Sequence, residues 1–123
     1  MHNILLQIAE QKKKDLIAQM IAVPIEVLAQ KNPNFPSRKN LFKRSIAQAG
    51  NFGLIAEIKL ASPTSGQLGT VDQLLQRAKQ YEEAGATAIS LVTEKHFFKG
   101  STDFVQKIKQ TVSVPILQKD FDL

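Results

Sequence analysis

Glu57 and Lys59 are the first residues along the chain whose types and spacing could do chemistry. They lie in an apolar run, residues 54–60, that ends at the turn residues Ser62 and Pro63. A run of this length between turn signals predicts a strand buried on both faces. Residues two apart on a strand project from the same face. Because buried charges are costly unless they pair or line a cavity, the stretch indicates either a core ion pair or the floor of an active site.

Polar side chains also follow two later apolar stretches. Residues 86–93 have the composition of a second buried strand, and the loop 94–100 follows them. Residues 114–117 begin a third strand, which leads into Lys119 and Asp120. The carboxyl ends of parallel strands meet at one edge of a sheet, where α/β proteins place their chemistry. We therefore expect the charged groups of all three strands to share one rim.

Helices separate the predicted strands. The apolar spacing predicts a helix over residues 71–84 that ends at Gly85. A second helix is predicted over residues 102–112, with Ser101 as its cap. Three strands alternating with two helices indicate consecutive right-handed βαβ units, and hence an α/β fold with a parallel sheet.

The first part of the chain is predicted to be helical. Ser37 can cap the last of its helices, and Gly50 can end it. We therefore divide the chain into an N-terminal helical extension, residues 1–50, and an α/β part, residues 51–123. The helices expected in the extension cover residues 3–22, 24–30 and 37–49.

Composition excludes several kinds of site. The chain has no cysteine, which excludes disulfides and thiolate catalysis and is compatible with a cytoplasmic location. His2 and His96 are its only histidines, so a histidine-rich metal site is not expected. No apolar run approaches the roughly 20 residues of a membrane span, so we expect no membrane association.

The net charge of +5 arises in the N-terminal segment. Residues 1–50 hold eight Lys or Arg against three acidic residues. Such an asymmetry can mark nucleic-acid binding. No aromatic side chain interleaves with the basic run 12–14, however, and no groove-reading motif is present. A solvated helix face is the favoured interpretation, attraction of an anionic small molecule is the second, and no nucleic-acid partner is expected.

Three ordered motifs resemble the indole-3-glycerol-phosphate synthase family. They are Ala-Glu-Ile-Lys-Leu-Ala-Ser-Pro at 56–63, Ala-Ile-Ser-Leu-Val-Thr at 88–93, and Pro-Ile-Leu-Gln-Lys-Asp-Phe at 115–121. The helical extension before the first strand is also similar, so the match spans essentially the whole chain. The resemblance implies a partial (β/α)8 TIM barrel preceded by an N-terminal helical extension. Residues 51–123 would then be the first three βα units of that barrel.

The family belongs to tryptophan biosynthesis. Its members are carboxy-lyases that close the indole ring of carboxyphenylamino-deoxyribulose phosphate and release carbon dioxide and water without a cofactor. The resemblance therefore implies an anionic, phosphorylated small-molecule substrate and no cofactor. Lys119 would be the general acid that protonates the substrate carbonyl as the ring closes. A lysine near other cations and apolar walls can be shifted toward a useful pKa, which makes this role physically reasonable.

The resemblance assigns roles to other residues of the motifs. Glu57 would hold the lysines in place and share in proton handling, and Lys59 would bind the anionic groups of the substrate as a point charge. Ser62 would contribute to substrate or phosphate contacts. Phe98 and Phe121 would wall the anthranilate ring, although ordinary packing is the alternative for both aromatic residues.

Departures from the family pattern limit what these motifs imply. The loop 94–97 reads Glu-Lys-His-Phe where the family more often has Asp-Glu-Lys-Tyr, and Gln118 stands where arginine is usual. Residues 64–65 read Thr-Ser where Ser-Lys is common. A complete barrel of this type needs about 250 residues. The fourth-strand glutamate that acts as base in the family, and its later phosphate-binding loops, have no counterpart in the 123 residues.

We therefore expect this chain to be inactive when it is alone. The alternative is a truncated, non-catalytic relative that acts as a self-associating or barrel-completing interaction module. A third possibility is another phosphate-binding barrel enzyme of the pathway, such as phosphoribosylanthranilate isomerase. It predicts a cysteine and an aspartate as acid and base, and the chain has no cysteine.

Overall fold

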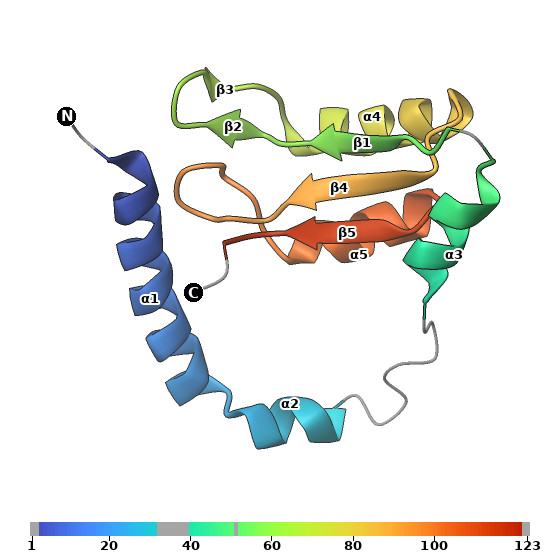
Figure 1. Cartoon of the computed structure of the whole chain (residues 1–123). Coiled ribbons are helices and arrows are strands. Elements are labelled where there is room, and N and C mark those ends of the chain that lie inside the picture. Colours follow the sequence, from blue (N-terminus) through green and yellow to red (C-terminus); the bar gives the residue numbers. More distant parts are fainter. Residues whose placement is uncertain (1–2, 32–39, 51, 122–123) are drawn as a thin grey trace. The chain divides into compact units, whose positions relative to one another are not determined.

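The computed structural model describes residues 3–31, 40–50 and 52–121 (Figure 1). These residues fall into two compact units. The first comprises residues 3–31 together with Phe121, and the second comprises the remaining described residues up to Asp120. The helix just before Gly50 groups with the sheet and not with the earlier helices. The division of the sequence at residue 50 remains a prediction.

The first unit contains two helices. Helix α1 spans Ile4–Ala22, and the side chain of Asn3 caps it by accepting a hydrogen bond from the Leu5 N–H at 3.1 Å. Helix α2 spans Ile25–Lys31, and the carbonyl of Pro24 accepts its first hydrogen bonds. Both predicted helices are therefore confirmed to within one or two residues. Neither these helices nor any other described helix is long and apolar enough to cross a membrane.

The second unit begins with helix α3, Leu41–Gln48. It starts later than the sequence indicated, at a left-handed Asn40, and the expected cap Ser37 lies outside the described residues. Gly50 follows the helix with a φ of 75°. This backbone conformation favours glycine, so the prediction that Gly50 ends the helix is confirmed.

Three parallel strands form the sheet of the second unit, as the alternation of strands and helices predicted. The strand order is β1-β4-β5, so β4 is central and every neighbouring pair is parallel. Consecutive βα units place each new strand beside the previous one, as in the first part of a (β/α)8 barrel. The strands are β1 Ile55–Ile58, β4 Ala88–Val92 and β5 Ile116–Lys119.

A small hairpin replaces part of the loop that the sequence predicted after β1. Strand β2, Ala61–Ser62, pairs antiparallel with strand β3, Gly66–Gln67. The hydroxyl oxygen of Ser62 accepts the Ser65 N–H at 3.0 Å, and Gly66 has a φ of 65°. These two features close a tight turn, so the flanking residues can pair as two-residue strands. The sequence indicated only a loop here, because most residues of this stretch are turn formers.

Helices α4, Val71–Glu83, and α5, Asp103–Thr111, cover one face of the sheet (Figure 1). Thr70 and Gln73 form a reciprocal capping box at the start of α4. The hydroxyl of Ser101 accepts the Asp103 N–H at 3.2 Å, so the predicted cap acts from one residue before Thr102, the N-cap position of α5. The core between helices and strands is apolar; its fully buried large side chains are Ile58, Leu74, Ile89, Leu91 and Ile108.

The other face of the sheet is partly open, which corrects the expectation that β1 is buried on both faces. Ile55 of β1 keeps 45% of its surface exposed, and Leu117 of β5 keeps 43%. Alternate residues of each strand point to opposite faces, and α4 and α5 cover only one of them. We call the face opposite these helices the inner face, because it would line the interior of a closed barrel.

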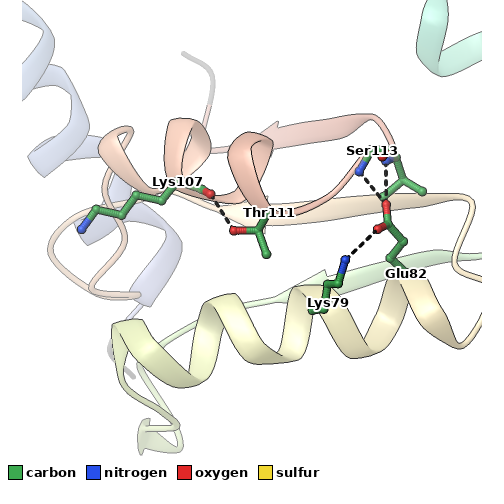
Figure 2. Close-up of polar contacts among 6 residues, drawn as sticks. Lys79, Glu82, Lys107, Thr111 and Ser113 are labelled. Carbon is green, nitrogen blue, oxygen red and sulfur yellow. Dashed lines mark hydrogen bonds and ion pairs between the residues drawn. The ribbon is translucent and has the colours of Figure 1, made fainter.

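A carboxylate of α4 ties the α5–β5 connection in place. One oxygen of Glu82 accepts the backbone N–H groups of Ser113 at 2.6 Å and Val114 at 3.1 Å (Figure 2). The other oxygen lies 3.9 Å from the Lys79 ammonium. These contacts hold the amino end of β5, the end of the strand away from Lys119.

Replacing Glu82 with alanine should lower the free energy of unfolding by about 2 kcal/mol, because two charge-assisted hydrogen bonds are lost. Urea unfolding followed by far-ultraviolet circular dichroism measures the change. Glu83→Ala is the matched control, since Glu83 lies on the same helix and is exposed. Equal losses in the two variants would show that the Glu82 contacts contribute nothing.

Candidate active site

The charged residues of the sheet lie on its inner face. The Cα partners across the three strands are Glu57, Ser90 and Leu117 in one row. Neighbouring residues in a parallel row share a face, and residues two apart along a strand do so as well. Lys119 therefore projects from the inner face beside this row, and so does Lys59 when the alternation of β1 is continued by one residue.

Glu57 pairs with Lys119 and not with Lys59. The ammonium of Lys119 donates to Oε2 of Glu57 at 2.9 Å, and the buried hydroxyl of Ser90 donates to the same oxygen at 3.3 Å. The Lys119 side chain is 55% exposed and that of Glu57 is 37% exposed. An ion pair this open contributes only about 0–1 kcal/mol to stability. The main effect of the ion pair is therefore to hold the Lys119 ammonium, a proton donor, next to the Glu57 carboxylate.

Lys59 places a second positive charge on this face. Continuing the β1–β4 register by one residue sets Lys59 opposite Val92, and Val92 is the Cα partner of Lys119. Strands lie about 4.8 Å apart, so the two lysine backbones flank β4 at a separation of about 10 Å. Two cations around one carboxylate leave a net positive charge between them. Such a charge suits an anionic ligand lying across β4.

The backbone of β5 is fixed beside these groups by the end of β4. The buried Thr93 donates its N–H to the carbonyl of Lys119 at 2.9 Å. Its hydroxyl lies 3.4 Å from that carbonyl and 3.5 Å from Oδ2 of Asp120. The ladder thus continues to the last residue of β5, and Lys119 projects from ordered backbone rather than from a loose loop end.

Ser62 has a structural contact within the β2–β3 hairpin. It is 8% exposed, and its hydroxyl oxygen accepts the Ser65 N–H. An accepting hydroxyl keeps its own proton available for donation. The turn explains why a serine occupies this position, and a contact from Ser62 to substrate remains a prediction.

The two candidate aromatic residues have different surroundings. Phe98 is half-buried in the loop between β4 and α5, at the carboxyl end of β4, where its N–H donates to Glu94. Phe121 is the last described residue and groups with the N-terminal unit. The structure therefore brings Phe98 to the same end of the sheet as Lys119, whereas the role of Phe121 remains a prediction.

Sequence reasoning did not single out Ser90 and Glu94. Ser90 stands alone in an apolar run, and its only signal is that alternation places it on the face opposite the helices. Glu94 is 3% exposed and accepts three backbone N–H groups of its own loop. The sequence signal that could have identified Glu94 is a carboxylate at the end of a buried strand, followed six residues later by a glycine.

No group of three or more histidine, cysteine, aspartate or glutamate side chains that could hold a metal ion occurs within residues 3–31, 40–50 and 52–121. The groups that the described chain offers for chemistry on its inner face are an ammonium, a carboxylate and a hydroxyl in contact. Lys59 follows the last residue of β1, and the alternation of that strand predicts a second ammonium on the same face. This set can transfer protons and attract anions.

Comparison with known proteins identifies the family. Residues 5–123 match the family model described as indole-3-glycerol phosphate synthase. Relatives that bear this name include proteins from Acetivibrio thermocellus, 40% identical over 119 residues, and Campylobacter jejuni subsp. jejuni, 38% identical over 121 residues. Each of these alignments covers 96% of the chain and 46% of the relative. A relative from Endomicrobium trichonymphae is 43% identical over 96 residues, which is 78% of the chain and 35% of that protein.

The chain thus spans less than half the length of the relatives that it matches. The three parallel strands and their covering helices agree with the first part of the TIM barrel that characterises this family. From the match over residues 5–123, the chain belongs to the indole-3-glycerol phosphate synthase family.

Proposed function

We propose that this chain takes part in the indole-3-glycerol phosphate synthase reaction of tryptophan biosynthesis. In this reaction, a carboxyphenylamino-deoxyribulose phosphate loses carbon dioxide and water as its indole ring closes. The observation that carries the proposal is the contact of Lys119 with Glu57 on the inner face. The β1–β4 register, continued by one residue, adds Lys59 across β4. The same arrangement supports a phosphorylated, anionic substrate.

Lys119 is the general acid of the proposed mechanism. Its ammonium carries the proton that the substrate carbonyl needs as the new ring bond forms, and an exposed side chain can leave Glu57 to reach that oxygen. Glu57 orients the ammonium beforehand, and Ser90 orients Glu57 through its hydroxyl. Lys59 neutralises an anionic group of the substrate. This division of roles explains why two lysines and one carboxylate share one face.

We further propose that turnover needs barrel strands beyond these. Strands β1 and β5 are the edges of the described three-stranded sheet, and each edge offers unpaired backbone groups to another strand. The exposed apolar side chains Ile55 and Leu117 on the inner face also suit burial by further strands. The groups on this face supply an acid and an anion site, and the base would come from the strands that complete the barrel.

Turnover of the 123 residues alone is expected to be absent, and the assay is the fluorescence of indole formed from the substrate. The same assay is then run on an equimolar mixture with the part of the Campylobacter jejuni relative that follows the matched segment. Turnover should appear in this mixture. Enzyme-like turnover by the chain alone would contradict the need for further strands. A stable complex that binds substrate but does not turn it over would contradict the catalytic proposal.

The second candidate is a non-catalytic interaction module, which the open edges of the sheet also favour. In that case the chain would form a defined homo-oligomer or would bind a barrel-completing partner without gaining activity. Light scattering over a range of concentrations, combined with substrate binding and the turnover assay, separates the two candidates. A stable oligomer that neither binds substrate nor accepts the complementary half would favour the module, whereas a complex with turnover would exclude it.

A further inference from the structure

The loop between β4 and α5 is organised around a buried carboxylate. Glu94 is 3% exposed, although it is charged and lies in a loop. Its Oε1 accepts the His96 N–H at 2.7 Å, and its Oε2 accepts the N–H groups of Phe97 at 2.8 Å and Phe98 at 2.9 Å. Both oxygens are thus used within a single turn of backbone.

The backbone closes the same loop from its other end. The Gly100 N–H donates to the carbonyl of Glu94 at 2.8 Å. A Cβ on Gly100 would lie 2.4 Å from the Val92 carbonyl oxygen, so only glycine allows the loop to return this close to β4. Lys99 adopts a left-handed conformation, with a φ of 55°, just before this return. Residues 94–100 therefore form a closed ring at the end of β4.

Burying a carboxylate is unfavourable unless charge-assisted hydrogen bonds compensate for the lost water. Here three backbone donors do so, and in exchange the carboxylate fixes three successive residues of the loop. A neutral side chain of the same size could not do the same. The amide of glutamine has one oxygen, so at least one backbone N–H would face an NH2 group.

The position of the ring connects it to the candidate site. It begins directly after Thr93, whose N–H holds the carbonyl of Lys119, and it includes Phe98. Phe98 is the residue of this loop that sequence analysis assigned to the wall of the substrate ring. Its backbone N–H is the third donor to Glu94. The conformation at Phe98 therefore depends on the Glu94 carboxylate.

We propose that Glu94 is a positioning residue that sets the affinity of the site for the aromatic ring of the substrate. It acts through the loop, by fixing the backbone that carries Phe98. This inference rests on the proposed function for the identity of the ligand. The contacts among Lys119, Glu57 and Ser90 include no residue of the ring 94–100, so Glu94 touches none of the reacting groups. Loss of the carboxylate should accordingly weaken binding more than it slows the chemical step.

The first test is amide hydrogen exchange in the 123-residue chain, which needs no activity. In Glu94→Gln, the amides of His96, Phe97 and Phe98 should lose protection relative to those of β4. Glu94→Asp keeps the carboxylate and should retain part of the protection. Glu83→Gln is the control, because it removes an exposed carboxylate from α4 and should change none of these amides. Unchanged protection in Glu94→Gln would overturn the proposal.

The second test is steady-state kinetics in the mixture with the complementary half of the Campylobacter jejuni relative. Glu94→Gln should raise KM by about tenfold, the worth of one aromatic contact, and change kcat by less than about threefold. Glu94→Asp should lie between Glu94→Gln and the unmodified chain. A fall in kcat at constant KM would overturn the positioning role. Absence of turnover in the mixture that contains the unmodified chain would overturn the proposed function, and with it the role of Glu94 in substrate binding. Hydrogen exchange would still decide whether Glu94 holds the loop.

Discussion

Replacing Lys119 with methionine should lower kcat by about a hundredfold to ten-thousandfold in the mixture with the complementary half. Methionine keeps most of the length and the apolar character of the lysine stem but carries no acidic proton, so the carbonyl oxygen would have to take its proton from water. The effect should fall on kcat, because protonation occurs as the ring closes. Pre-steady-state measurement of indole fluorescence reports this step directly.

The fold should survive this substitution. The ion pair between Lys119 and Glu57 is exposed and contributes only about 0–1 kcal/mol, so the urea midpoint should change little. Lys109→Met is the matched control, since Lys109 is an exposed lysine of α5 on the other side of the sheet. A Lys119→Met variant that retains kcat within about threefold of the unmodified chain would exclude Lys119 as the general acid.

Replacing Gly100 with alanine should lower the free energy of unfolding by about 3 kcal/mol. The new Cβ would lie 2.4 Å from the Val92 oxygen and 2.7 Å from the carbonyl carbon and the Cα of Thr93. All three atoms belong to the backbone, so no side-chain rotation can relieve the overlap. Either the loop or the end of β4 must move, and β4 is the central strand of the sheet.

Gly53→Ala is the control for Gly100→Ala. A Cβ on Gly53 would meet its nearest atom, Cγ2 of Ile46, at 3.4 Å, and its other close neighbours at 3.7 Å. We expect a change below about 1 kcal/mol there, because these are near-ordinary contacts. Urea unfolding of both variants, read by circular dichroism, makes the comparison. Equal urea midpoints for the two variants would show that Gly100 is not tightly packed against the end of β4.

The Gly100→Ala substitution should also weaken the hydrogen bonds that Glu94 makes within its loop. The Gly100 N–H is hydrogen-bonded to the Glu94 carbonyl, so displacement of Gly100 removes one closure of the ring. The amides that Glu94 holds should then exchange faster even under conditions where the variant remains folded. The Glu82→Ala variant should behave differently. Its lost contacts lie at the amino end of β5, so the exchange rates of the amides held by Glu94 should not change.

The order of elements was predictable from the sequence, because it depends on local signals. Apolar periodicity and turn residues predicted the three parallel strands and the helices between them, and the structure confirms these elements. Glycine at a left-handed position ends α3, and a hydroxyl precedes α5. The β2–β3 hairpin was missed, because two-residue strands are too short to show a period.

The partners of the site residues were not predictable from local signals. Glu57 and Lys59 are two residues apart, and a core ion pair was one of the two interpretations that the sequence allowed. In the structure Glu57 instead contacts Lys119, which is 62 residues away, and Ser90. The register of β1, β4 and β5 decides these contacts, and register depends on the packing of whole strands against α4 and α5.

The sequence by itself therefore determined the fold class, the family motifs and the residue types at the carboxyl ends of the strands. Only the tertiary structure decided which carboxylate faces which ammonium, that Ser90 joins them, and that Glu94 is buried in its own loop. The physical reason is the range of the interactions. Helix periods, caps and turns arise within a few residues, whereas a charge pair across a sheet and a buried carboxylate exist only after distant segments have packed.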